Sequence, residues 1–129
     1  MTTPAATTEE EYLIEYEKQQ QKDKQLLDEV VQRHKVTKAY QIKVPIGEST
    51  TEFAYGYIRY PNRIDISIAM TLKDTDPLKG KEIVLRNSWL EGDMRILDDD
   101  ELFLRATTVL DDILAVRRAI LKKNWTNGG

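Results

Sequence analysis

The feature that most constrains this chain is an apolar stripe near its C-terminal end, which keeps helical spacing for about six turns. Such a stripe forms one face of a helix and has to be covered by other parts of the protein. Acidic residues 98–101 precede it and basic residues follow it. Charges of these signs interact favourably with the helix dipole at both ends and stabilise the helix. The stripe consists of Leu102, Phe103, Ala106, Val109, Leu110, Ile113, Leu114, Val116, Ile120 and Leu121.

The chain has 129 residues, which is enough for one compact domain with an additional arm or tail. Charged residues make up 32% of it, above the usual value of about 25%, so we expect part of the chain to lie outside the core. A net charge of −3 provides no overall attraction for nucleic acid or anionic lipid. The absence of cysteine excludes disulfides, thiolate metal sites and a cysteine nucleophile.

A long helix is also predicted near the N-terminus. Residues 1–8 are small and Thr-rich, which predicts a disordered tail. From Glu9 to about Lys35 there is no Gly or Pro and most residues favour helix, with Thr7 or Thr8 as the cap. Its apolar residues form two separate groups, so only the two ends of the helix can dock. The groups are Tyr12, Leu13, Ile14 and Tyr16, and then Leu26, Leu27, Val30 and Val31.

Two interpretations of this arm are open. In the first, its second apolar group packs on the domain and the arm has no further role. In the second, the helix projects and grips a partner through Tyr12 and Tyr16. The predicted organisation is a disordered tail at 1–8, a helical arm at 9–38, a compact α+β domain at 39–124 and a second disordered tail at 125–129.

A β-hairpin is predicted directly after the arm. Apolar residues alternate with polar ones from Tyr40 to Ile46, which indicates a half-buried strand. Residues 47–50 resemble a turn, and residues 51–60 again alternate, so the two strands should pair antiparallel. The alternation places three aromatic rings on one face of the second strand: Phe53, Tyr55 and Tyr57.

Residues 63–72 satisfy two sets of local rules. Alternating β-branched residues favour a strand, whereas Pro61, a possible cap at Asn62 and apolar residues at helical spacing favour a helix. Asp76 as N-cap and Pro77 as first residue predict a further helix that ends at Gly92. The predicted fold class is α+β, a small antiparallel hairpin packed against about three helices, with an additional N-terminal helical arm.

The sequence contains no recognisable catalytic constellation. His34 is the single histidine, and its place at the end of the arm fits a solvated side chain favoured by the helix dipole. The acids at 98–101 are contiguous, which suits helix capping better than a calcium loop. Gly80 and Lys81 lack the remaining residues of a phosphate-binding loop. We therefore expect no enzymatic activity, no cofactor and no bound metal.

Aromatic and basic residues interleave along the second strand and just after it. Rings that stack on bases beside cations are typical of single-strand binding, but a small hairpin also needs aromatic residues to cover helices. The second explanation is the simpler one, and nucleic-acid binding is kept as an alternative. The N-terminal segment has no apolar core typical of a signal peptide, and the apolar runs are too short to span a membrane. These features predict a cytoplasmic protein without a membrane partner.

Two segments give the chain a family resemblance. Residues 57–63 read Tyr-Ile-Arg-Tyr-Pro-Asn-Arg, an aromatic-hydrophobic-Arg-x-Pro-x-Arg motif, and residues 89–93 read Trp-Leu-Glu-Gly-Asp. Together with the order of segments between about Tyr40 and Lys123, they resemble the small tail assembly chaperones of tailed bacteriophages and prophages. The long Gln-rich arm departs from that family's pattern. The resemblance implies that residues 63–72 are helical.

The resemblance also implies a function without catalysis. Such a chaperone binds the tape measure protein and tail tube subunits in the host cytoplasm during virion assembly, and it self-associates. The two alternatives are a virion structural component, such as a head–tail connector or small tail protein, and a single-stranded nucleic-acid-binding module. The candidate contact residues are Tyr12, Tyr16, Tyr55, Tyr57, Arg59, Arg63 and Trp89.

Overall fold

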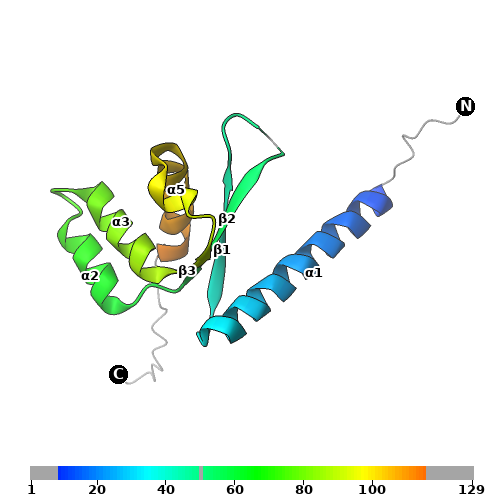
Figure 1. Cartoon of the computed structure of the whole chain (residues 1–129), viewed down its shortest axis with the longest axis horizontal. Helices are drawn as coiled ribbons and strands as arrows, with labels where there is room; N and C mark the ends of the chain where they lie inside the picture. The colour runs from blue at the N-terminus through cyan, green and yellow to red at the C-terminus, as the bar shows by residue number, and fades with distance from the viewer. Residues whose placement is uncertain (1–8, 50, 116–129) are drawn as a thin grey trace, which may run out of the picture.

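A computed structural model of the chain describes residues 9–49 and 51–115. Helices α2 to α5 gather on one side of a small sheet, and the long helix α1 lies on the other side and diverges from it (Figure 1). The fold is therefore α+β with an N-terminal helical arm, as predicted. The elements are α1 (Glu9–His34), β1 (Ala39–Pro45), β2 (Phe53–Arg59), α2 (Arg63–Thr71), α3 (Pro77–Ser88), β3 (Trp89–Gly92), α4 (Arg95–Asp98) and α5 (Asp100–Leu114).

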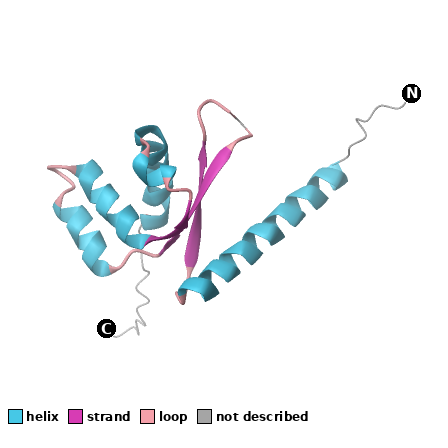
Figure 2. Cartoon of the chain, viewed as in Figure 1, coloured by secondary structure: helices cyan, strands magenta, loops and turns pink. Residues whose placement is uncertain are grey.

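The sheet has three antiparallel strands in the order β1-β2-β3 (Figure 2). Strands β1 and β2 pair along their whole length, from Ala39 opposite Arg59 to Pro45 opposite Phe53. The predicted hairpin is therefore confirmed. Strand β3 pairs with β2 over a shorter stretch, with an irregularity in register after Tyr57.

The third strand corrects the prediction that helix α3 continues to Gly92. The helix ends at Ser88, and Trp89 already has extended backbone angles (φ −64°, ψ 133°). The Trp89 ring lies over Gly56 of β2, where an added Cβ atom would come within 2.6 Å of ring atom Cζ3. Gly92 has φ +132° and lies against the β2 backbone, which other residues could not do without strain.

The face of the sheet that meets helices α3 to α5 carries the main core. Ile42 and Val44 of β1 and Ile58 of β2 are fully buried there, as the alternation predicted. The helices supply Val84, Leu85, Ile96, Leu97, Leu102, Phe103, Ala106 and Leu110. The part of the apolar stripe that lies in α5 therefore packs against the sheet and against α3 and α4.

The last helix ends earlier than predicted. Asp99 caps α5, because its Oδ2 accepts the backbone N–H of Leu102 at 3.0 Å. At the other end the N–H of Ala115 bonds to the carbonyl of Asp112, which tightens the last turn, and Ala115 leaves the helical region (ψ 119°). The last three residues of the predicted stripe, the cap at Thr7 or Thr8 and both predicted tails lie outside the described residues.

Residues 63–72, for which the local rules disagreed, form helix α2 and its C-terminal cap, Leu72. Asn62 Oδ1 accepts the N–H of Asp65 at 2.9 Å, which is the predicted cap. Asp76 caps α3 in the same way through the N–H of Lys79, and Pro77 occupies the first turn. Short side-chain caps therefore fix where both helices begin.

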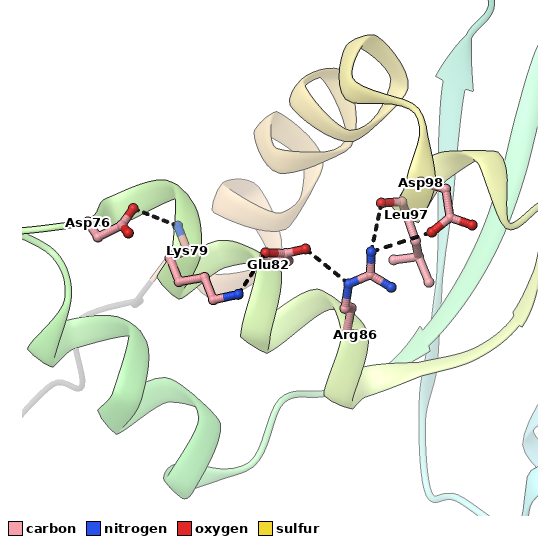
Figure 3. Close-up of polar contacts among 6 residues, drawn as sticks. All are labelled: Asp76, Lys79, Glu82, Arg86, Leu97 and Asp98. Atoms are coloured by element: carbon pink, nitrogen blue, oxygen red, sulfur yellow. Dashed lines mark hydrogen bonds and ion pairs between the residues drawn. The ribbon is translucent and has the colours of Figure 1, made fainter.

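A chain of polar contacts ties α3 to the corner between α4 and α5 (Figure 3). Glu82 accepts hydrogen bonds from Lys79 Nζ at 3.3 Å and from Arg86 Nε at 3.1 Å. Arg86 also donates to the Leu97 carbonyl at 3.1 Å and lies 3.4 Å from Asp98 Oδ1. The hydrogen bonds from Arg86 and Lys79 lower the pKa of the Glu82 carboxyl below its usual value.

We expect Glu82 to make the stability depend on pH in the acid range. Because its pKa is lowered in the folded state, the ionised carboxylate stabilises the fold above about pH 4.5, and this contribution is lost as the pH falls through the lowered pKa. Glu82→Gln should therefore lower the free energy of unfolding near pH 7, and the difference from the wild type should shrink as the pH falls below about 4.5. Urea titrations across this range measure the difference, which should be small and salt-sensitive because the pair is exposed. A difference that stays constant down to pH 3 would contradict this assignment.

Candidate protein-binding site

The C-terminal half of α1 is fastened to the outer face of the sheet. The buried residues of this contact are Val30, Ala39 and Tyr57, and the partly buried ones are Leu27, Val31 and Leu90. The predicted docking of the second apolar group on the domain is therefore confirmed. The cluster holds α1 at one end only, since α1 has no other buried residue.

Polar contacts at the same end fix the direction of the arm. His34 Nε2 and Arg33 Nη1 lie 2.8 Å and 3.1 Å from Glu91 Oε1 of β3. Lys35 has a left-handed backbone (φ +54°), which ends the helix and turns the chain into β1. This turn brings His34 against β3, so His34 is a partner of Glu91 and not the solvated side chain that was expected.

The N-terminal half of α1 carries apolar side chains on its surface. Tyr12 is 70% exposed and Tyr16 is 55% exposed, and Leu13 and Ile14 between them are also exposed. We call the segment Glu9–Glu17 the acidic tip, because it contains five glutamates and no basic residue. Tyr12 and Tyr16 are one helical turn apart and therefore lie on the same face.

Tyr57 and Arg59 were expected to lie on a free face as contact residues. The structure shows that neither of them does. Tyr57 is only 9% exposed beneath α1, and its hydroxyl oxygen accepts a hydrogen bond from Gln41 Nε2. Arg59 Nη2 donates to the carbonyl of Asn87 at 2.7 Å and lies 3.5 Å from Asp65 Oδ2. Both side chains hold elements of the domain together. Two of the aromatic and basic residues considered for nucleic-acid binding are therefore occupied by contacts within the domain.

The remaining candidate residues are spread over the molecule. Trp89 is partly buried against the main core, while Tyr55 is exposed beside Phe53 on the outer face of the hairpin. Arg63 is exposed on α2, which lies on the side of the sheet opposite the arm (Figure 1). The seven candidate contact residues therefore do not form one site. Among them, only Tyr12 and Tyr16 share an exposed surface.

Helix α2 is held by a buried carboxylate together with the close contact of a small apolar side chain, Ala69. Asp65 is its one buried residue, and Asp65 Oδ1 accepts a hydrogen bond from Asn87 Nδ2 at 2.9 Å. Helix α3 approaches α2 closely at Gly80, where a Cβ atom would lie 3.1 Å from Ala69 Cα. Because these contacts are polar or small, the larger apolar side chains of α2 stay on the surface.

The surface of α2 was not identified from the sequence. Ile64 is 72% exposed and Met70 is 69% exposed. A mostly apolar groove of about 320 Å³, which we call the α2 groove, lies between α2, α3 and the end of α5. It is lined by Ile66, Ala69, Met70, Lys73, Pro77, Lys81, Asp111 and Leu114. The one signal for this surface in the sequence was Asp65, a carboxylate inside an apolar run. Because Asp65 is buried, the polar side of α2 faces inward and its apolar side faces outward.

Within residues 9–49 and 51–115, no three His, Asp or Glu side chains gather where they could hold a metal ion. No helix among these residues is long and apolar enough to cross a membrane. Comparison with known proteins finds no matching family model, no matching curated protein and no matching solved structure.

Asp65→Ala should loosen α2 from the domain. The substitution leaves the Asn87 amide without its acceptor and removes the counter-charge of Arg59, so we expect a loss of about 1–3 kcal/mol in the free energy of unfolding. Chemical denaturation measures this loss, and Asp74→Ala, at an exposed acid in the same part of the chain, is the matched control. Equal effects of the two substitutions would show that the buried carboxylate does not hold α2.

Proposed function

We propose that this chain is a phage tail assembly chaperone-like protein that binds another polypeptide without catalysis. The proposed partner is the tape measure protein or the tail tube subunit, and the proposed compartment is the host cytoplasm. The observation that supports this proposal is the acidic tip, an exposed apolar group at the free end of a helix that is anchored at its other end.

The shape of the arm suits this task. The 21 residues from Glu9 to Glu29 give a helix of about 30 Å that leads away from the anchor at Val30. Exposed apolar residues on one helical face are the usual means by which a helix enters a groove or pairs with another helix. An extended helical partner exposes apolar stripes of its own before assembly, and these stripes cause aggregation when they stay uncovered.

The charge of the tip adds selectivity to this contact. Tyr12, Leu13 and Tyr16 provide apolar area, while five glutamates surround them on the same segment. We expect the tip to prefer apolar surfaces flanked by Lys and Arg and to be repelled by acidic ones. The added negative charge also keeps a bound, aggregation-prone partner in solution.

Removing the tyrosines of the tip should weaken partner binding. We expect Tyr12→Ser/Tyr16→Ser to lower recovery of a co-expressed tape measure protein by at least about tenfold, because aromatic anchors dominate such interfaces. Both side chains are exposed, so circular dichroism should show an intact fold. Gln20→Ser/Gln21→Ser, on the exposed middle of the same helix, is the matched control and should retain binding.

Two outcomes would contradict the proposal. Equal recovery with the tyrosine variant and the control would show that the tip does not carry the contact. The presence of the wild-type chain in mature virions at fixed copy number would make it a structural component instead of a chaperone.

A further inference from the structure

We infer that the acidic tip of one copy of this chain docks in the α2 groove of a second copy and so joins the copies head to tail. The contact needs only this chain, so it goes beyond the proposed function. It can be tested without a tape measure protein.

The α2 groove has the chemistry that an apolar helix end requires. Five of its eight lining residues are apolar, and Met70 among them is an exposed, flexible side chain that adapts to different shapes. Its volume of about 320 Å³ lies at the small end of the range for ligand pockets, roughly 300–1,000 Å³. It therefore suits one or two side chains from a helix, such as a tyrosine and its neighbour one turn away.

The charges around the groove complement those of the tip. Lys73 and Lys81 line the groove, and Arg63 lies exposed on α2, about two helical turns from Met70. Lys81 pairs with Asp111, the one acid among the lining residues. The side chains of Arg63 and Lys73 take part in no ion pair within residues 9–49 and 51–115. Two cations are thus left for the glutamates of the tip.

The arrangement of the fold makes this contact intermolecular. The arm lies on one side of the sheet, and helices α2 and α3 lie on the other, far from the free end of α1 (Figures 1 and 2). The anchor at Val30 and the pairs of Arg33 and His34 with Glu91 hold the arm in that direction. The tip therefore cannot reach its own groove. Two different surfaces meet in each contact, so the association can repeat as a chain or close as a ring.

Sedimentation velocity of the full chain from micromolar to millimolar concentration tests the contact. The wild type should form oligomers that grow with concentration and dissociate at high salt. Tyr12→Ser/Tyr16→Ser at the tip and Met70→Ser/Lys73→Glu at the groove should each weaken association by at least about tenfold. All four side chains are exposed, so neither variant should lose its fold, and Gln20→Ser/Gln21→Ser should behave as the wild type.

Mixing the two variants separates this arrangement from other kinds of association. A groove variant still has an intact tip, and a tip variant still has an intact groove, so the mixture should form dimers of one copy of each and nothing larger. A mixture that stays monomeric would overturn the inference, because it would indicate contacts between like surfaces. A groove variant that associates as well as the wild type would also overturn it, by showing that the groove is covered by something other than the tip.

The absence of cysteine from the chain permits a second, direct readout. A copy with Leu13→Cys and a copy with Met70→Cys should form a mixed disulfide under mild oxidation. Gln21→Cys in place of Leu13→Cys is the control and should give little of it. Equal yields from the two pairs would contradict the proposed contact.

Discussion

Strand β2 packs on both of its faces, and this packing decides which surfaces of the molecule stay free. Ile58 and Gly56 face helices α3 to α5 and the ring of Trp89, whereas Tyr57 faces the arm. The arm covers the outer face of the sheet only near Val30, so its other end projects. Contacts made by adjacent residues of one strand thus fix both the compact domain and the direction of its arm.

The free surfaces follow from how the peripheral helices are attached. Helix α1 docks through its C-terminal apolar group, which leaves the acidic tip uncovered. Helix α2 docks through Asp65 and a close approach at Gly80, which leaves Met70 and its neighbours uncovered. Each attachment leaves apolar area exposed, and the two areas lie on opposite sides of the sheet (Figure 1). The proposed binding of a partner and the inferred association of copies both use these areas.

Local rules predicted much of the fold, while contacts between distant segments decided the rest. The arm, the hairpin and the caps at Asn62 and Asp76 depend on neighbouring residues, and all of them are present. Strand β3 depends on the fit of Trp89 over Gly56, 33 positions away in sequence, and helical spacing alone could not reveal it. Alternation placed Tyr57 opposite the core, but it could not show that the arm covers that ring.

We propose that the tip covers a partner's apolar surface. The most direct test is hydrogen–deuterium exchange of the full chain, measured with and without the tape measure protein. It should be done at a concentration where the chain alone is monomeric. We expect slower amide exchange in residues 9–17 when the partner is added, and no change in residues 27–34, which are already docked. Unchanged exchange in residues 9–17 together with new protection elsewhere in the domain would contradict it.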